Sequence, residues 1–468
     1  MSTFGRREHT LIRQVRDPLL FVGDVDGVGW DEFAQVRVDG SPARHALVLE
    51  VDGDLAVLQV LEGTDGIDPS RTRVVFAGQP LHVPVGPAWL GRVCNGRGAP
   101  VDGGPPVSAD EQSPVAGLPM NPLRRQPPAE PVLTGLSAID GFATVVRGQK
   151  LPLFSVAGLP HLAIATQVAA QASAAGEPFC VVFAGMGLTH ADAAAVRDSL
   201  EERSAAGELS LLLNLADDPV VERLLTPRIA LTVAEHLAFT EGRHVLVVMG
   251  DMTSYAEALR EVSSGRGEIP ARRAYPGYLY SDLASLYERC GRVRGLPGSV
   301  TVLPFLTMPA GDIAHPVPDL TGYITEGQIV LSPQVAAESV YPPVDLLGSL
   351  SRLMRTGAGA GRTRDDHLDV AAQGLAALAR AQQARELADL VGEEALSETD
   401  RRYVAFATAL HHEVIDQSPS ENRPMAETLD RLWTALALLP TRELSMVSAE
   451  QRRAHLPERP GERAAVTS

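Results

Sequence analysis

Lysine is almost absent from this sequence. Lys150 is the only lysine among the 41 basic residues, and the others are arginines. A phosphate-binding loop of the form G-x-x-x-x-G-K-[ST] needs a lysine to bring positive charge to the phosphates of a nucleotide. Lys150 precedes the apolar run at residues 151–154, so it lies at the far end of the expected strand from the turn that follows. It therefore cannot be the lysine of a phosphate loop at that turn.

Cysteine and metal-binding patterns are also scarce. The three cysteines, Cys94, Cys180 and Cys290, are widely spaced and form no CxxC motif, which favours a reducing compartment and thiols that act as small apolar groups. The twelve histidines show no HExxH spacing, and His411 and His412 are adjacent rather than one helical turn apart. We expect no metal site made by this chain alone.

Long apolar runs and an excess of positive charge are missing as well. No run approaches the roughly 18 residues of a membrane span, and the N-terminal sequence MSTFGRREHT has no apolar signal-peptide core. The net charge of −17 argues against a broad nucleic-acid surface, which requires clustered basic residues. We expect no nucleic-acid partner and no direct membrane insertion, so that any membrane association is peripheral.

The N-terminal part of the chain has the pattern of a β-barrel. The length of 468 residues suggests about three domains. From residue 8 to about 75, short alternating apolar runs flank turn clusters such as Asp52-Gly53-Asp54, which predicts a small barrel. Glycine and proline dominate residues 78–131, so we expect an ordered segment without long helices that wraps a neighbouring domain. A disordered linker is the alternative for this segment.

The middle of the chain has an α/β pattern and the end a helical one. Between about 132 and 345, strand-like runs alternate with helical segments such as 191–203 and 227–240, which predicts a mostly parallel sheet with ligands at the strand ends. The expected strands are 151–154, 179–183, 209–215, 244–249, 300–306 and 328–331. After residue 346 the apolar spacing predicts a helical bundle over 366–391, 398–415 and 425–439, with a frayed, polar stretch at 449–468. The predicted domains are 1–77, 78–345 and 346–468.

A turn after the run at 151–154 has the position of a phosphate loop. A functional loop uses glycines to expose backbone N–H groups, a lysine for charge and a hydroxyl for Mg²⁺. Here Ser155 and Gly158 are present, but the positions of the second glycine, the lysine and the hydroxyl fall among Leu159, Pro160, His161 and the residue after it. The sequence therefore predicts a degenerate phosphate loop.

Two further elements of a nucleotide hydrolase are weak or missing. Asp251 follows the apolar run 244–249, as does the acid that orients Mg²⁺ in such enzymes, although many strands end in an aspartate that only forms a turn. The strand at 178–183 runs into Ala184-Gly185-Met186-Gly187, where no acid or amide is present to align an attacking water. Asp251 is thus a candidate for a vestigial Mg²⁺-type acid.

The stretch from Arg272 to Tyr280 combines arginines, tyrosines and a Pro-Gly turn. Arg272, Arg273, Tyr275 and Tyr278 are residue types that interfaces favour, because they give a large contact area with planar hydrogen bonding. We expect a subunit interface here. A core-facing aromatic cluster is the alternative.

Arg352 ends the most distinctive string in the chain, PPVDLLGSLSR at residues 342–352. Its paired prolines fix the entry, its small residues permit close approach, and Arg352 lies at the junction of the α/β and helical regions. An arginine in this position can reach a phosphate held by a neighbouring subunit and stabilise the charge that develops during transfer. An arginine that forms a salt bridge between two domains is the alternative.

These strings, taken in order, resemble the B subunits of the V/A-type rotary ATPases, also called the beta chains of V-type ATP synthases. The resemblance runs from about Arg13 to Leu439. It is carried by LGRVCNGRGAPVDGG (90–104), GLPMNP (117–122), LTGLSAID (133–140), VRGQKLPLFS (146–155), TPRIALTVAEHLAF (226–239), DMTSYAEALREVS (251–263), EIPARRAYPGYLYSDLASLYERCG (268–291), PDLTGYITEGQI (318–329) and YPPVDLLGSLSRLM (341–354).

The resemblance implies a β-barrel, a RecA-like α/β domain and a C-terminal helical bundle. It implies an alternating ring with catalytic A subunits, and central and peripheral stalk subunits, on the cytoplasmic side of the cell membrane. Arg352 corresponds to the family's arginine finger, which acts in trans on ATP or ADP with Mg²⁺ held mainly by the A subunit, and Ser351 is a second candidate contact to this nucleotide. The complex, rather than this chain alone, is then the enzyme.

The chain departs from the family pattern in two places. The family loop often reads SGSGLP followed by a polar residue and Asn, whereas Val156 and Ala157 precede Gly158 here. Leu346 and Gly348 stand where prolines are frequent. Two other functions remain as alternatives to a ring subunit of this kind, which couples ATP synthesis or hydrolysis to H⁺ or Na⁺ transport: a stand-alone ATPase like those of flagella and secretion systems, and a purely structural ring spacer.

Overall fold

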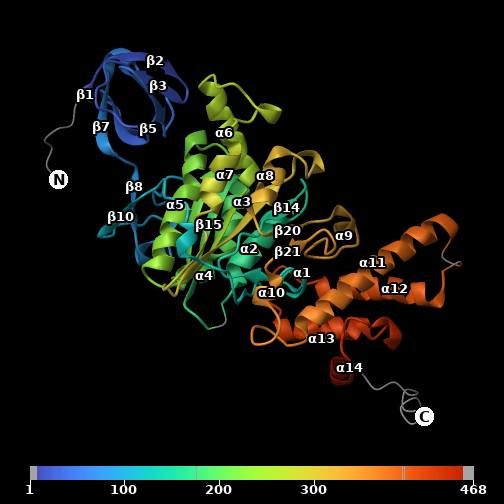
Figure 1. Ribbon diagram of the computed structural model, residues 1–468. Coiled ribbons are helices and arrows are strands. Elements are labelled where there is room, and N and C mark those ends of the chain that lie inside the picture. Colours follow the sequence, from blue (N-terminus) through green and yellow to red (C-terminus); the bar gives the residue numbers. More distant parts are fainter. Residues whose placement is uncertain (1–7, 175, 393, 395, 457–468) are drawn as a thin grey trace, which may run out of the picture. The chain divides into compact units, whose positions relative to one another are not determined.

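The computed structural model describes residues 8–174, 176–392, 394 and 396–456, which form two compact units (Figure 1). The first unit contains the described residues up to 126 together with Phe179–Thr307 and Asp312–Ile324. The second contains Pro127–Pro178, Met308–Gly311 and the described residues from Thr325 onward. The predicted order of a β-barrel, an α/β region and a helical region is confirmed.

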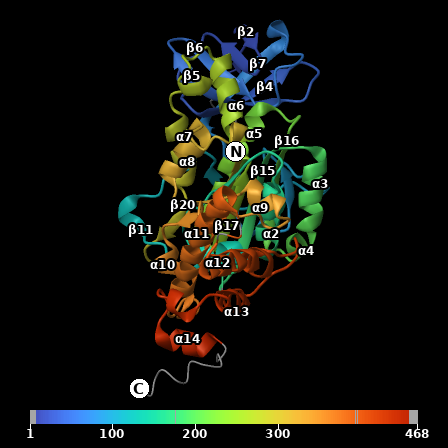
Figure 2. The ribbon, with the colours of Figure 1, turned by 90° about the vertical axis from the view of Figure 1, so that its right-hand side faces the viewer.

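The first unit begins with the predicted barrel, drawn in blue in Figure 2. Seven antiparallel strands follow the order β1-β7-β4-β5-β6-β3-β2. Residues of alternate positions point inward, as in β4, where Ala34, Val36 and Val38 are buried while Arg37 is exposed. The predicted turn at Asp52-Gly53-Asp54 joins β5 to β6, and Gly53 has φ +60°, a conformation that favours glycine. The strands are β1 (Glu8–His9), β2 (Ile12–Arg16), β3 (Leu19–Val22), β4 (Glu32–Val38), β5 (Arg44–Asp52), β6 (Leu55–Val60) and β7 (Thr72–Pro80).

The Gly/Pro-rich segment is ordered and holds no α-helix, which agrees with its composition. Its short strands are β8 (His82–Val85), β9 (Val93–Asn95), β10 (Glu111–Pro114), β11 (Arg125–Gln126) and, at its end in the second unit, β12 (Pro131–Val132). β10 pairs with β8, and β9 adds to a parallel sheet by pairing with β16. Trp89, within this segment, is buried and donates its indole N–H to the carbonyl of Pro84 at 2.7 Å.

A parallel sheet forms the rest of the first unit. Neighbouring strands β9, β16 (Leu209–Leu215), β15 (Phe179–Leu188), β17 (His244–Gly250) and β19 (Ser299–Thr307) are all parallel, and β18 (Gly291–Val293) adds antiparallel to β19. The connecting helices are α3 (His190–Ser199), α4 (Glu201–Ala205), α5 (Val220–Phe239), α6 (Met252–Gly265), α7 (Leu279–Tyr287) and α8 (Pro316–Ile324).

Three element boundaries in this sheet differ from the prediction. The helix expected at 227–240 begins at Val220 and contains Pro227, because buried residues on both sides of the proline hold the helix in the core. The helix expected at 191–203 is two helices, which separate at the fully buried Leu200. Strand β15 extends to Leu188, five residues beyond the predicted end, because it pairs with β17 as far as Gly185 and with β16 as far as Leu188.

The second unit contains three neighbouring strands of a sheet. β14 (Leu153–Ser155) is parallel to β20 (Gly327–Val330), and β21 (Leu350–Ser351) is antiparallel to β20. A hairpin pairs β12 with β13 (Val145–Val146), and short helices surround these strands: α1 (Ser137–Phe142), α2 (His161–Gln171), α9 (Pro333–Ala337) and α10 (Met354–Gly357).

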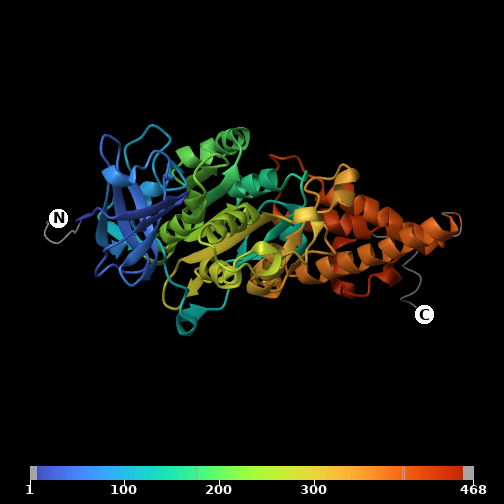
Figure 3. The same ribbon diagram turned by 90° about the horizontal axis from the view of Figure 1, so that it is seen from above.

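The predicted helical bundle completes the second unit. α11 (His367–Val391) packs along α12 (Glu398–Ala409), and Figure 3 shows these two helices side by side in orange. α12 continues as a π-helix over Leu410–Ile415, and α13 (Met425–Leu436) packs against this segment and α11. No helix in the described part of the chain is long and apolar enough to span a membrane.

The prediction of fraying after residue 449 was wrong for its first part. Ala449–His455 is a helix, α14, that begins with a capping box. The Ser448 hydroxyl accepts the backbone N–H of Gln451 at 3.1 Å, and the Gln451 side chain accepts the N–H of Ser448 at 2.7 Å. The remainder of the predicted stretch, residues 457–468, lies outside the described residues.

Candidate functional site

The turn between β14 and α2 uses two of its backbone N–H groups within itself. Leu159 N–H donates to the carbonyl of Val156 at 3.3 Å, and His161 N–H donates to the carbonyl of Leu159 at 2.9 Å. Pro160 has no N–H to offer. A phosphate loop binds through N–H groups that point at the ligand. In residues 156–160, called here the degenerate loop, Leu159 and Pro160 offer no free N–H group, and the lysine is missing.

The remaining predicted residues of the degenerate loop fit a structural role. Gly158 has φ +90°, which permits the turn without strain. Ser155 is fully buried, and its hydroxyl donates to the carbonyl of Val156 at 3.0 Å. The imidazole Nδ1 of His161 lies 3.1 Å from the carbonyl of Leu159. No residue of this turn presents a positive group suited to a triphosphate or a hydroxyl suited to its Mg²⁺, so the loop does not fit a bound nucleotide.

Lys150 is bound to an acid at the opposite end of β14. Its side chain is 3% exposed, and Nζ lies 3.1 Å from Oε1 of Glu326. Its backbone N–H donates to Oε2 of the same carboxylate at 2.8 Å. Because β14 and β20 are parallel, the residues that precede the two strands meet at the same edge of the sheet.

Arg352 lies at this same edge. β21 is antiparallel to β20, so the residue after β21 meets the residue before β20, and Arg352 N–H donates to the carbonyl of Glu326 at 2.9 Å. The Arg352 side chain is exposed, and Nη1 donates to the carbonyl of Thr325 at 3.3 Å. Within the described part of the chain it has no carboxylate partner, so the salt bridge between domains that the sequence left open is not present there.

The close approach of β21 to β20 requires a glycine. Gly327 has φ +131°, and a Cβ at this position would lie 1.9 Å from the carbonyl oxygen of Leu350. Any other residue would push β21 away. Gly327 therefore fixes the backbone position from which Arg352 projects.

Ser351, a buried residue of β21, holds this strand in place through its side chain. It is 6% exposed. Its hydroxyl donates to the carbonyl of Thr144 and accepts from Nε2 of Gln149, both at 3.0 Å. The Gln149 amide also donates to the carbonyl of Glu326 at 3.3 Å. The Ser351 side chain is thus engaged within the chain, which favours a positioning role over contact with a nucleotide.

Asp251, in the first unit, has both carboxylate oxygens engaged with backbone N–H groups. It caps α6 by accepting Thr253 N–H at 2.7 Å, and it accepts Thr307 N–H at 3.2 Å and 3.1 Å on its two oxygens. These contacts match the turn-forming alternative. Its role as a vestigial Mg²⁺-type acid stays a prediction.

The predicted interface residues of the first unit divide into two kinds. Arg272 and Arg273 are exposed and form ion pairs with Asp319 at 3.4 Å and Asp312 at 2.7 Å. The Tyr275 side chain is 2% exposed and donates its hydroxyl to Glu257, as the core-facing alternative expected for this one residue. Its burial raises the pKa of the Tyr275 hydroxyl. Arg272, Arg273 and the half-exposed Tyr278 stay predicted interface residues.

The sequence did not predict a role for Gln149, Glu326 or Gly327. For Lys150 it predicted only that this residue cannot be the lysine of a phosphate loop. Glu326 is 176 residues from Lys150, and no local pattern joins them. The signal that was available is the position of Lys150 and Glu326, each just before a predicted strand, because parallel strands bring such residues together.

Comparison with known families matches three regions of the chain in order. Residues 12–78 match the beta-barrel domain of the ATP synthase alpha/beta family, and residues 135–351 match the nucleotide-binding domain of that family. Residues 356–456 match the C-terminal domain of V and A type ATP synthase.

Individual relatives cover nearly the whole chain. The B subunit of the A-type ATP synthase of Aeropyrum pernix is 50% identical over 456 residues, which are 97% of this chain and 98% of that protein. The solved structure of the ATP synthase subunit NeqB from Nanoarcheaum equitans has a TM-score of 0.71 and 35% identity, and the match covers 90% of this chain and all of that one. The chain therefore belongs to the ATP synthase alpha/beta family, as a B subunit of the V/A type.

Proposed function

We propose that this chain is the non-catalytic ring subunit of a V/A-type ATP synthase and that it completes the catalytic site of a neighbouring A subunit with Arg352. A and B subunits alternate in the ring, which contacts central and peripheral stalks on the cytoplasmic side of the membrane. The complex couples ATP synthesis or hydrolysis to transport of H⁺ or Na⁺. The similarity to the B subunit of an A-type ATP synthase and to the ATP synthase subunit NeqB supports the complex to which the chain is assigned.

The observation that carries the proposal is the placement of Arg352 relative to the degenerate loop. The loop follows β14, whereas Arg352 lies beside the start of β20, level with Lys150. The five residue steps from Lys150 to Ser155 span about 16 Å at the rise of a strand, which exceeds the length of an arginine side chain. Arg352 is therefore too far from the chain's own loop to reach it, as expected of an arginine that acts in trans.

The chemistry of Arg352 suits a phosphoryl group. Its guanidinium is permanently charged and presents a planar fork of N–H donors that matches phosphate oxygens. The contact with the carbonyl of Thr325 orients one donor and leaves the charge without an acid to neutralise it among the described residues. When Mg²⁺ and ATP are bound by the partner, Arg352 would stabilise the charge that develops on the transferring phosphoryl group.

Mg²⁺ and the body of the nucleotide belong to the partner subunit in this proposal. The degenerate loop lacks the lysine and the hydroxyl that would hold them, and Ser351 is buried. Arg352 is therefore this chain's direct contact with the nucleotide.

ATP turnover by the purified chain and by the assembled complex tests the proposal. We expect no turnover of Mg-ATP by the chain alone and steady turnover by the complex. Steady turnover by the chain alone would instead support the stand-alone ATPase of the flagellar or secretion class. Full turnover by a complex that carries R352A would support the structural spacer.

A further inference from the structure

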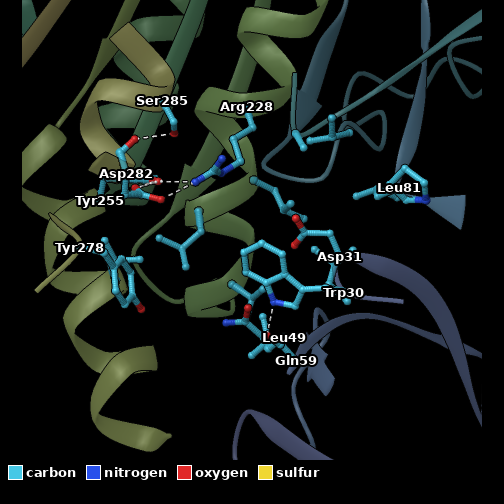
Figure 4. Close-up of a pocket in the computed structure, with 18 of the residues that line it drawn as sticks. Trp30, Asp31, Leu49, Gln59, Leu81, Arg228, Tyr255, Tyr278, Asp282 and Ser285 are labelled. Atoms are coloured by element: carbon cyan, nitrogen blue, oxygen red, sulfur yellow. Dashed lines mark hydrogen bonds and ion pairs between the residues drawn. The ribbon is translucent and has the colours of Figure 1, made fainter. Parts of the chain in front are cut away.

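A cavity in the first unit has no part in the proposed function (Figure 4). It has a volume of about 550 Å³ and lies between the barrel and helices α5, α6 and α7. Cavities of this size accommodate small organic ligands. Its lining contains no residue of the Arg352 edge, so any ligand here would be separate from the nucleotide.

Most of the cavity wall is apolar. Leucine and valine side chains come from the barrel, from the segment after it and from the helices, and they include Leu47, Leu49, Leu81, Val115, Leu225 and Leu259. Such a wall favours a ligand with an apolar body, because burial of that body away from water stabilises the complex.

The barrel side of the cavity presents an exposed aromatic ring and an unpaired acid. Trp30 is 74% exposed, and its indole N–H donates to the carbonyl of Leu49, which fixes the plane of the ring. Asp31 has φ +59° and donates its backbone N–H to the carbonyl of Val48 at 2.9 Å. Its carboxylate has no hydrogen-bond or ion-pair partner among the described residues, and Figure 4 shows it beside Trp30 at the cavity.

The positive groups of the facing wall are already neutralised. Arg228 donates to Oδ1 of Asp282 at 2.6 Å, and the Tyr255 hydroxyl donates to Oδ2 of the same carboxylate at 2.6 Å (Figure 4). Arg266 lies 3.1 Å from Glu268. Burial raises the pKa of Asp31, and the charges of Arg228 and Arg266 offset this rise only in part. Asp31 is therefore a carboxylate at the cavity without its own counter-ion.

A second polar group at the cavity lacks a partner. Gln59 lines the same wall and is 4% exposed, and within the described part of the chain its Nε2 has no acceptor. A buried N–H donor without an acceptor is costly, and an oxygen atom of a ligand would remove this cost.

We propose that this cavity binds an amphipathic organic cation, with its ammonium group held by the Asp31 carboxylate and the face of Trp30. An unpaired carboxylate attracts a cation, also where it is exposed as Asp31 is, and an indole face attracts ammonium groups. The apolar body of the ligand lies along the leucines, and an ether or hydroxyl oxygen accepts from Gln59. The proposal does not depend on the role of Arg352.

Three probes of one size and different charge test this assignment. The purified full chain is titrated by calorimetry with 3-phenoxypropylammonium, 3-phenoxypropanol and 3-phenoxypropanoate, and fluorescence is followed in parallel because Trp30 is far more exposed than the buried Trp89 and Trp433. We expect saturable one-to-one binding of the cation, at least about tenfold weaker binding of the alcohol, and no binding of the anion. Equal binding of the three probes, preference for the anion, or no binding of the cation would overturn the proposal.

Two variants assign the binding to the cavity. Asp31→Asn removes the charge and keeps the fold, because asparagine tolerates the positive φ of this position. It should weaken binding of the cation about tenfold or more, whereas Trp30→Leu should weaken it about threefold to tenfold. Asp52→Asn is the matched control, since Asp52 is an exposed barrel acid outside the cavity, and it should leave the affinity unchanged. Wild-type affinity in Asp31→Asn would contradict the assignment.

Discussion

The degenerate loop and the Arg352 edge lie at opposite ends of the same three strands, β14, β20 and β21, and they differ in the groups that remain available for chemistry. At the loop, the N–H groups of Leu159 and His161 donate to neighbouring carbonyls, a proline removes another donor, and no lysine is present. At the opposite edge, Gly327 permits the close approach of β21, and an ion pair between buried Lys150 and partly exposed Glu326 holds the start of β20. The Arg352 guanidinium is exposed there.

This difference indicates that one edge of a sheet can lose its phosphate-binding residues while the other edge keeps the residues that position an arginine. The strand and helix around the degenerate loop still pack, since Leu153, Ile164 and Val168 are fully buried. The loop therefore retains a scaffold without a phosphate site. The residues that would hold a nucleotide have been replaced at one edge, while the residues that position an arginine are complete at the other.

Arg352→Ala should give the largest change. We expect ATP hydrolysis by the assembled complex to fall on the order of 10³-fold, because a guanidinium that stabilises the transferring phosphoryl group is lost. Arg352→Lys should recover part of this rate, since lysine keeps the charge and loses the planar fork. Arg355→Ala is the control, because Arg355 is an exposed neighbour, and it should retain the wild-type rate. An unchanged rate of hydrolysis in Arg352→Ala would show that the Arg352 edge contributes no more to catalysis than the degenerate loop does.

Gly327→Ala should have the next largest effect. Its Cβ would lie 1.9 Å from the carbonyl of Leu350, so β21 must shift and carry Arg352 with it. A displacement of about 1 Å can cost on the order of 100-fold in rate, which steady-state hydrolysis by the complex would measure. Gly322→Ala is the matched control, since a Cβ there meets nothing within 4 Å. Equal rates for the two variants would show that β21 does not position Arg352.

Lys150→Met should reduce the rate of ATP hydrolysis by the complex about tenfold. The variant loses the ion pair that holds Glu326, and the carbonyl of Glu326 accepts the backbone N–H of Arg352, so Arg352 would be less precisely positioned. Because Lys150 is buried away from the nucleotide, kcat should fall while KM for ATP stays constant. Loss of the ion pair should also cost about 2 kcal/mol in the free energy of unfolding. The double variant Lys150→Met with Glu326→Gln should recover the free energy of unfolding, because no unpaired carboxylate remains, but it should not recover the rate of ATP hydrolysis. A change in KM alone would contradict this positioning role.

His161→Ala should have the smallest effect. The imidazole contacts the turn itself, and no phosphate contact is expected, so the rate of the complex should stay within about twofold of wild type. A loss comparable to that of Arg352→Ala would mean that the degenerate loop still contributes to catalysis. The comparison between the two edges would then fail.

Much of the fold follows from apolar spacing, but the contacts that position Arg352 do not. The parallel strands and the three long C-terminal helices were predictable because each has a strong local period. The start of α5 was not, because packing on both sides of Pro227 overrides the usual preference of proline for a first turn. The capping box at Ser448 was available in the sequence as S-x-x-Q and was overlooked.

The sequence predicted some features of the candidate site and not others, because some are local and others depend on contacts between distant segments. The absence of a phosphate lysine is a local property that composition reveals. The pairing of Lys150 with Glu326 and the demand for glycine at 327 arise only when strands far apart in sequence become neighbours. The unpaired state of Asp31 likewise depends on which helices neutralise Arg228 and Arg266, and no sequence pattern specifies that.

Binding of a transition-state mimic tests the central claim most directly. The affinity of the assembled complex for Mg-ADP, with and without aluminium fluoride, would be measured for wild type and for Arg352→Ala. We predict that the variant binds Mg-ADP as wild type does and loses at least about 100-fold in affinity for the fluoride complex, because Arg352 acts on the transferring phosphoryl group. Equal losses for both ligands, or no loss for either, would contradict the account.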